Sequence, residues 1–551
     1  MAASIASNIT SFLPSREELL RDGILTAASK NIPLTIGIAT LLTLLLNTLL
    51  TPRVDPREPP LLKPSIPLIG HIVDLFRYQA KFHTVLSRKN RDQYPIATLQ
   101  MLTGKMYAIW DPTLIASGFK NKHLSTNPII HKYINNLMAP TPEGLKLLTS
   151  PEGDEMADKM LKHIIPQSMR GIHLENMTNV ALGQLSVKFN QLSCTPEQIP
   201  NFYLWARHVL CYATSTTLYG DASQDPFRLN PEMEQAVFDF ESSLMQLSLG
   251  LPFPAVTAAK GHRARQTLRK GLEPFYSQKL YDKPEVCEFV RSRAHTLHKD
   301  NIPEVDIPRV EIMLPFAAMA NTAPTLFWFL VFVLSSPKER QDRLRREVLD
   351  ALVLASPETA GEEQVEVCMK INQALVEEKC PLLWASYRET MRVTVHQVAS
   401  RQVTHDTVLQ SSQGQEFLLK AGTQVQMAPG NMHKMSGWWG EDADQFRPER
   451  WLEPQNLRST RVAYAPFGGG IHLCPGRMFA FTEMAAVVAI FLLGFEVEPN
   501  AFGRKEWKLP GYRLGSLVDA VSKPADDGEG FGMNVKPRKG WENVKWKLEY
   551  A

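Results

Sequence analysis

Residues Phe467 to Arg477 read FGGGIHLCPGR, and no other segment constrains the structure of this 551-residue chain so strongly. Three consecutive glycines allow backbone conformations and close approaches that larger residues would block. Pro475 and Gly476 shape the backbone immediately after Cys474. The apolar run from Met478 to Phe495 follows directly and predicts a helix, whose positive N-terminal end favours an anionic sulfur. The segment therefore predicts a loop that holds one thiolate against a flat ligand.

The frame FxxGxxxCxG, formed by Phe467, Gly470, Cys474 and Gly476, resembles the haem-binding loop of the cytochrome P450 family. The resemblance implies that Cys474 is the axial thiolate ligand of the iron of haem b, a donor that favours cleavage of the O–O bond. The alternatives are a buried free cysteine in a glycine-rich turn and a zinc site shared with His472, but no further zinc ligands lie nearby at suitable spacing. Family members usually have arginine at the position of His472, where it contacts a haem propionate. Because the charge of histidine depends on pH, we expect His472 to bind a propionate less strongly.

Two segments upstream of this loop carry charged residues in a second pattern. Leu383–Val393 reads LWASYRETMRV, which places Glu389 and Arg392 on the same side of a helix, and Phe446–Trp451 reads FRPERW and contains Arg450. Together they resemble the ExxR and PERF motifs of the same family, in the expected order before the cysteine loop. The resemblance implies a buried structural network behind the haem, in which planar guanidinium groups bind the carboxylate bidentately. The alternative is a surface salt bridge.

Ile312–Leu334 reads IMLPFAAMANTAPTLFWFLVFVL and contains no charged residue, so by length alone it could span a membrane. A polar and helix-breaking patch at mid-length, formed by Asn321, Thr322, Pro324 and Thr325, is costly against lipid. The sequence therefore favours a buried central helix beside a polar site. Because proline has no N–H to donate, we also expect a kinked groove at this patch.

The resemblance identifies this segment with the long helix that crosses the distal haem face. Most family members have an acid followed by threonine there, which direct protons to the iron-bound oxygen; this chain has Asn321 and Thr322. Asparagine cannot relay a proton by ionising, but its amide can orient water. The alternative is that Asn321 only forms a hydrogen bond inside a helix kink. The sequence ANTAP followed by FW resembles the branch that contains sterol 7α-hydroxylases and prostacyclin synthase.

The resemblance extends to residues at the edge and in the wall of the haem pocket. Arg401, just after the helix that carries Glu389, resembles the family arginine that binds a haem propionate. By family position, the candidate residues of the substrate pocket are Phe316, Met319, Ala320 and Val398.

The N-terminal region differs in composition from the rest of the chain. Ile32–Leu50 has nineteen residues and no charge, which predicts a transmembrane helix rather than a cleaved signal peptide, because some thirty polar or mixed residues precede it. Six prolines between 52 and 67 predict a stiff hinge through which neither helix nor sheet continues. We thus expect an anchor-bearing segment at 1–51, a hinge at 52–70 and one haem domain at 71–551. Flanking basic residues favour a cytosolic body.

The overall composition excludes several classes of protein. Hydrophobic residues make up 44% and charged residues 21%, which is typical of a globular chain rather than a disordered one. Sixty Lys and Arg residues against 57 Asp and Glu residues give no electrostatic argument for a nucleic-acid partner. The six cysteines contain no CxxC pair, which favours a reducing compartment. Helical periodicity, as in Lys338–Leu354, dominates, and strand-like patches such as Thr423–Met427 are short and late. The fold class is mainly α with a minor β part, as in cytochromes P450.

The resemblance implies a haem-thiolate monooxygenase of the endoplasmic reticulum membrane, with a single span and a cytosolic catalytic domain. NADPH-cytochrome P450 reductase supplies electrons from NADPH, with cytochrome b5 as a second donor. The expected substrate is a hydrophobic terpenoid or steroid-like molecule of a biosynthetic pathway, by analogy alone. Two alternatives remain. One is a haem-thiolate isomerase or dehydratase that acts on a peroxide without a reductase, and the other is a membrane haem-binding protein without catalysis.

Overall fold

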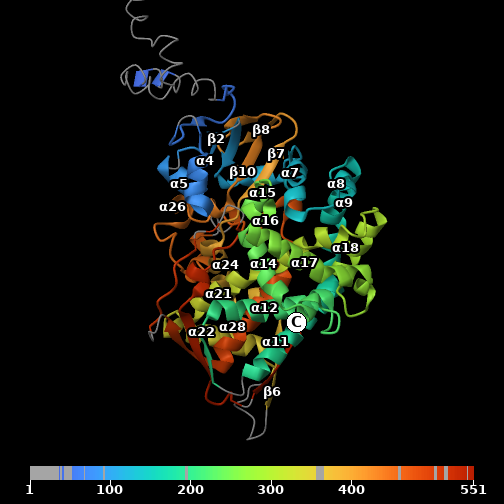
Figure 1. Ribbon diagram of the computed structural model, residues 1–551. Helices are drawn as coiled ribbons and strands as arrows, with labels where there is room; N and C mark the ends of the chain where they lie inside the picture. The colour runs from blue at the N-terminus through green and yellow to red at the C-terminus, as the bar shows by residue number, and fades with distance from the viewer. Residues whose placement is uncertain are drawn as a thin grey trace, which may run out of the picture.

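The computed structural model describes most of the chain after the first fifty residues. The described ranges are 36–37, 40–41, 52–66, 69–90, 93–102, 104–192, 196–354, 365–456, 461–501, 506–513, 515, 519–542 and 544–551. Apart from four residues, the predicted transmembrane helix at 32–50 lies outside these ranges. Figure 1 shows the larger sheet at one end of the molecule and the helices filling the rest.

The larger sheet has six strands in the order β1-β2-β3-β10-β7-β4. β10 pairs with β3 in parallel and with β7 in antiparallel orientation, so that Val425 lies between Tyr107 and Arg401. The strands are β1 (Leu61–Leu62), β2 (Ile96–Gln100), β3 (Lys105–Ile109), β4 (Leu124–Ser125), β7 (Ala399–Val403) and β10 (Gln424–Met427). β10 confirms the predicted late strand.

The sequence prediction missed the early part of this sheet. All residues of β2 are buried, as are most of those of β3, so neither strand shows the alternation of apolar and polar residues that marks a half-exposed strand. The predicted hinge also contains a strand, because Leu61 and Leu62 pair with β2 in parallel. The expectation that no sheet passes through 52–70 was therefore wrong. The prolines flank β1, and its two leucines retain the N–H groups that pairing needs.

The helical body buries a core between five long helices. They are α11 (Gly171–Leu192), α12 (Phe202–Tyr219), α21 (Thr322–Leu334), α24 (Pro381–Thr394) and α28 (Arg477–Gly494). Every residue of α21 is buried, and so are fifteen of the eighteen residues of α28. α22 (Lys338–Leu352) packs outside α24 and α28 with its apolar face inward. The mainly α class with a minor β part is confirmed.

Among the described residues, Ile307–Leu334 and Gly470–Gly494 have the length and composition of membrane spans, but both are largely buried in the protein. The prediction of a buried helix at 312–334 is therefore confirmed. The helix is interrupted: α19 (Ile307–Glu311), α20 (Met313–Met319) and α21 are separate. The interruption falls at Ala320 and Asn321, and Pro324 lies in the first turn of α21, where a missing N–H costs nothing.

The remaining elements surround this core. The other helices of seven or more residues are α4 (Ile72–Tyr78), α5 (Phe82–Lys89), α6 (Pro112–Lys120), α7 (Asn127–Met138), α8 (Pro142–Leu148), α9 (Pro151–Lys159), α14 (Glu232–Ser242), α17 (Ala259–Ser277), α18 (Glu288–Lys299) and α23 (Gln373–Lys379). Shorter helices include α10 (Ile165–Ser168) and α15 (Leu244–Ser248). The smaller sheets are β11 (Phe495–Ala501) with β12 (Phe531–Pro537) and β5 (Glu197–Ile199), β6 (Val365–Ile371) with β13 (Val544–Tyr550), and β8 (Thr407–Gln410) with β9 (Glu416–Leu419).

Candidate active site

Cys474 lies in a tight loop directly before α28. The Cys474 N–H donates to the Phe467 carbonyl at 3.1 Å, which closes the loop. Gly470 has φ +63°, and a Cβ there would stand 2.3 Å from the carbonyl oxygen of Phe119, so only glycine fits. Burial raises the pKa of the Cys474 thiol, whereas backbone N–H groups of Gly476 and Arg477 favour the thiolate. A sulfur atom held in this way can bind a cation on the side that the loop leaves open.

Cys474 lines a cavity. The space between the lining atoms, including the solvent-open mouth, measures about 1140 Å³. One face of the interrupted helix α20–α21 forms part of its wall through Leu314, Ala317, Ala318, Asn321, Thr322 and Thr325. These positions follow the three- and four-residue spacing of a single helix face. The loop contributes Phe467, His472, Cys474 and Gly476. The structure therefore brings the predicted cysteine loop and the predicted Asn321–Thr322 pair to one cavity.

The four candidate pocket residues do not line this cavity. Phe316 packs against Phe240, with ring centroids 6.1 Å apart, and Met319 and Ala320 are buried on the other faces of the helix. Their spacing places them off the helix face that lines this cavity, and their contact with a substrate stays a prediction. In the connection after α24, Gln397 lines the cavity instead of its neighbour Val398.

Asn321 and Thr322 stand at the junction between α20 and α21. The Thr322 hydroxyl donates to the Ala318 carbonyl at 2.9 Å, and the Thr325 hydroxyl donates to the Asn321 carbonyl at 2.8 Å. Thr322 is buried except for 8% of its surface, and Asn321 is half-buried. The Thr322 oxygen keeps lone pairs with which it can accept a hydrogen bond from water in the cavity.

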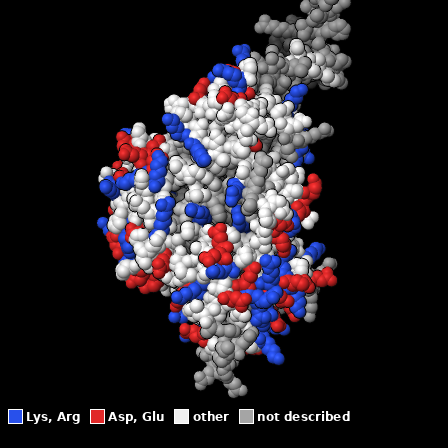
Figure 2. Space-filling view, turned by 180° about the vertical axis from the view of Figure 1, so that it is seen from behind, with Lys and Arg blue, Asp and Glu red and all other residues white. Residues whose placement is uncertain are grey.

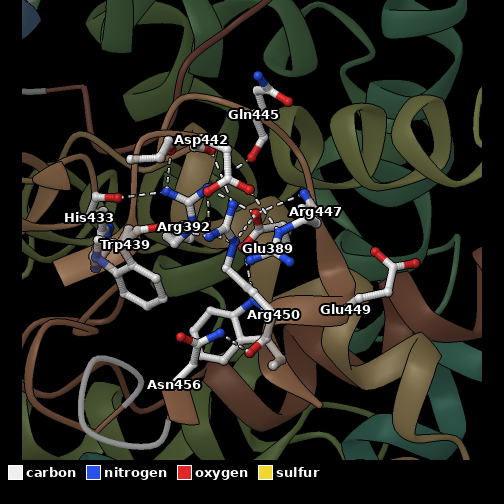
Figure 3. Close-up of polar contacts among 12 residues, drawn as sticks. Glu389, Arg392, His433, Trp439, Asp442, Gln445, Arg447, Glu449, Arg450 and Asn456 are labelled. Atoms are coloured by element: carbon white, nitrogen blue, oxygen red, sulfur yellow. Dashed lines mark hydrogen bonds and ion pairs between the residues drawn. The ribbon is translucent and has the colours of Figure 1, made fainter. Parts of the chain in front are cut away.

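Glu389 is fully buried and is the centre of a polar network, which Figure 3 shows. Arg392 binds its carboxylate bidentately, with both N–O distances 2.9 Å, and Arg450 Nε donates to Oε1 at 2.9 Å. Arg447 N and Trp451 Nε1 complete the shell, each at 2.9 Å. The structure therefore brings together the three residues predicted from the two motifs, and in buried rather than surface positions.

This network is joined to the cysteine loop through His433. Arg392 Nη1 donates to the His433 carbonyl at 2.7 Å, and Ala465 N donates to His433 Nε2 at 3.1 Å. Ala465 lies two residues before Phe467. Burial lowers the pKa of His433 to about 3, so the ring is neutral and can accept this bond. No sequence signal pointed to His433, because its role depends on two segments far apart in the chain.

Arg401 and His472 lie at one edge of the site. Arg401 is 7% exposed, and burial lowers its pKa to about 10. Its guanidinium donates to the adjacent Ser400 carbonyl at 2.8 Å, and no carboxylate pairs with it among the described residues. His472 Nε2 is 3.2 Å from Thr126 Oγ1, and burial, together with the nearby charge of Arg401, lowers the pKa of His472 to about 4. A buried cation without an anion fits an anionic group such as a haem propionate.

Figure 2 shows the charged side chains on one face of the described surface. On the face that Figure 2 shows, basic and acidic side chains are interspersed, in line with the formal net charge of +3. The candidate site is the interior cavity that Cys474 lines.

Comparisons with known proteins agree with this geometry. The family model of cytochrome P450 matches residues 59–518. A cytochrome P450 monooxygenase of Gibberella zeae is 31% identical over 528 residues, which are 94% of this chain and 96% of that protein. The human 7-alpha-hydroxycholest-4-en-3-one 12-alpha-hydroxylase is 23% identical over 466 residues, which are 80% of this chain and 87% of that enzyme.

The solved structure of a retinoic acid bound cyanobacterial CYP120A1 has the same fold. It matches with a TM-score of 0.62 and 19% identity, and the match covers 87% of this chain and 99% of that one. Enzymes of the cytochrome P450 family hold haem iron by a cysteine thiolate and receive electrons from a redox partner. The chain therefore belongs to the cytochrome P450 family, and it is a haem-thiolate monooxygenase of that family.

Proposed function

We propose that Cys474 is the axial ligand of haem b in a membrane-anchored monooxygenase that oxidises a hydrophobic small molecule. The observation that carries the proposal is that Cys474 and the Asn321–Thr322 junction line the same cavity. When bound, the haem supplies activation of molecular oxygen. The loop around Phe467, Gly470 and Gly476 would accommodate its proximal side.

The edge residues would hold the propionates. Arg401 offers a buried guanidinium without a carboxylate partner, and His472 offers a neutral ring nitrogen. Glu389, Arg392 and Arg450 contribute through the position of the cysteine loop, because the network reaches that loop through His433.

We expect Thr322 to take part in proton transfer. Its Oγ1 can accept a hydrogen bond from a cavity water while it donates to Ala318, and the Asn321 amide can orient that water. Asn321 holds no ionisable proton, so we expect protons to arrive along cavity water that is hydrogen-bonded to Thr322 Oγ1. The apolar wall excludes bulk water, which limits proton transfer to this path.

Replacement Thr322→Ala should uncouple NADPH consumption from product formation. We expect product per NADPH to fall by about tenfold or more, with consumption largely retained. The measurement is product and NADPH from the same incubation. Thr296→Ala is the matched control, because the Thr296 hydroxyl donates to the Ser292 carbonyl at 2.8 Å on α18, outside the cavity. Unchanged coupling in Thr322→Ala would contradict the role.

The substrate is proposed to be a terpenoid or steroid-like molecule of a biosynthetic pathway. The cavity wall is largely apolar, and its lining residues include Met169, Met177, Leu218 and Phe289. A bulky polycycle could bury its surface against such a wall. The similarity to the human 12-alpha-hydroxylase supports this class, although at 23% identity.

NADPH-cytochrome P450 reductase is the proposed electron donor, with cytochrome b5 as a second one. Turnover should therefore require both NADPH and the reductase in a reconstituted system. The rival activity is isomerisation or dehydration of a peroxide, which Asn321 favours because it lacks the usual acid. Product formation from a hydroperoxide substrate at the same rate without reductase would establish that rival.

The N-terminal segment is proposed to anchor the enzyme in the endoplasmic reticulum membrane by one span at about 32–50, with the haem domain in the cytosol. In this division 1–51 carries the anchor, 52–70 joins it to the body and 71–551 forms the haem domain. Residues 52–66 contact two sheets: β1 pairs with β2 of the larger sheet, and Leu418 N on β9 donates to the Arg57 carbonyl at 2.8 Å.

Deletion of residues 1–51 should transfer the protein from the microsomal pellet to the supernatant. The apolar run is the only segment in that region long enough to span the hydrocarbon. The carbon monoxide difference spectrum of the truncated protein should stay unchanged. A truncated protein that still sediments fully with membranes would disprove anchoring by this segment.

A further inference from the structure

The polar groups of the cavity wall differ in how far their hydrogen-bonding capacity is used. The hydroxyls of Thr322 and Thr325 donate to the carbonyls of Ala318 and Asn321 in their own helix. Gln397 differs from them, because its Oε1 is shielded from solvent and has no hydrogen-bond partner among the described residues. A shielded amide oxygen without a partner is unfavourable, and a group that enters the cavity can satisfy it.

The backbone fixes the position of Gln397 in the wall. Gly430 N donates to the Gln397 carbonyl at 3.2 Å, and the preceding residue, His396, donates through its N–H to the Ala520 carbonyl at 2.8 Å. Gln397 Nε2 lies 3.3 Å from the point where a Cβ on Gly468 would stand. The last torsion of a glutamine side chain is broad, so rotation can turn Oε1 into the cavity that the residue lines.

We propose that Gln397 Oε1 accepts a hydrogen bond from a hydroxyl group of the substrate, so that the preferred substrate is an apolar alcohol. This rests on the proposed function and narrows its substrate class. A hydrocarbon of the same shape would leave the amide unpaired, and a site built for a hydroxyl rejects the analogue that lacks it. The cavity lining offers little support for a substrate that carries a carboxylate. Arg477 is the one Lys or Arg among the described lining residues, and its guanidinium donates to the Cys474 carbonyl at 2.9 Å.

The test compares matched probes by the shift of the Soret band on titration of the full chain in microsomes. The probes are androstanol, androstanone and androstane, with dodecanol and dodecane as a second set. We expect each alcohol to bind about tenfold more tightly than its hydrocarbon, because one hydrogen bond is gained. The ketone has no donor for Gln397 Oε1 and should bind more weakly than the alcohol.

Variants of Gln397 test whether this residue causes the preference for alcohols over hydrocarbons. Gln397→Leu should weaken alcohol binding by about tenfold and leave hydrocarbon binding unchanged. Gln397→Glu keeps an acceptor and should restore the alcohol preference. Gln402→Leu is the control, because Gln402 lies on β7 outside the cavity lining and its amide points to the Gly422 carbonyl.

Three results would overturn the inference: no binding of either alcohol, equal binding of alcohol and hydrocarbon, or an alcohol preference that survives in Gln397→Leu. Faster haem loss from Gln397→Leu without a change in alcohol preference would also overturn it, since the amide would then serve the haem edge. The carbon monoxide difference spectrum and the reductase-dependent turnover are recorded on the same preparations. If both persist, only the role of Gln397 fails; if both are absent, the proposed function fails.

Discussion

Cys474→Ser should abolish the red-shifted Soret band of the reduced carbon monoxide complex and reduce monooxygenase activity below detection. A serine hydroxyl is not ionised near neutral pH, so it cannot replace the thiolate as a strong electron donor to the iron. The surrounding loop should persist, because its closure depends on the backbone bond from the N–H of residue 474 to the Phe467 carbonyl. The measurement is the difference spectrum of dithionite-reduced microsomes.

The control for this prediction is Cys380→Ser, which replaces a buried cysteine whose Sγ donates to the Glu347 carbonyl at 3.4 Å, away from the cavity. It should keep the spectrum of the unsubstituted protein. A normal red-shifted band in folded Cys474→Ser would show that another residue binds the iron, and the ligand assignment would have to be given up.

Glu389→Gln should destabilise the protein more than any substitution of a surface charge. The carboxylate accepts hydrogen bonds from five N–H groups, those of Arg392 (Nε and Nη2), Arg447, Arg450 and Trp451. The amide of glutamine removes the charge that compensates two buried guanidinium groups, and breaking such a pair costs about 3–5 kcal/mol. The measurement is the free energy of unfolding from urea titration, followed by fluorescence and by haem absorbance.

Glu449→Gln is the matched control for the network. Glu449 also binds an arginine bidentately, with N–O distances to Arg340 of 2.7 and 3.0 Å, but its side chain is 37% exposed. Figure 3 shows it apart from the cluster around Glu389. An exposed pair contributes about 1 kcal/mol or less. Equal destabilisation by the two substitutions would show that burial does not decide the strength of the network.

Much of the site could be predicted because its chemistry is concentrated in short segments. The cysteine loop and the Glu389–Arg392 spacing are local patterns, and the structure brings each to the expected surroundings. The Asn321–Thr322 pair could also be predicted to lie at the site, because it too belongs to a short local pattern. Strand β1 was not predicted because prolines flank it. Strands β2 and β3 were not predicted because both of their faces are buried.

The residues that escaped prediction act through tertiary contacts. Gln397 and Val398 are neighbours in the sequence, and only the backbone position of the connection decides which of them faces the cavity. The same holds for Phe316 and Met319, whose orientation depends on where the distal helix is interrupted. Periodicity gives the spacing of a helix face but not which face meets the cavity.

The contact of His433 with Ala465 connects the cysteine loop to the segment that surrounds Glu389, so we expect haem retention and folding stability to be coupled. Release of the cysteine loop would take away the Ala465 N–H that donates to His433 Nε2, and we expect this to loosen the 433–451 segment that surrounds Glu389. A ligand that binds only the folded form stabilises it by mass action. We therefore expect haem binding to raise the fraction of folded protein, and so its resistance to proteolysis, as well as its activity.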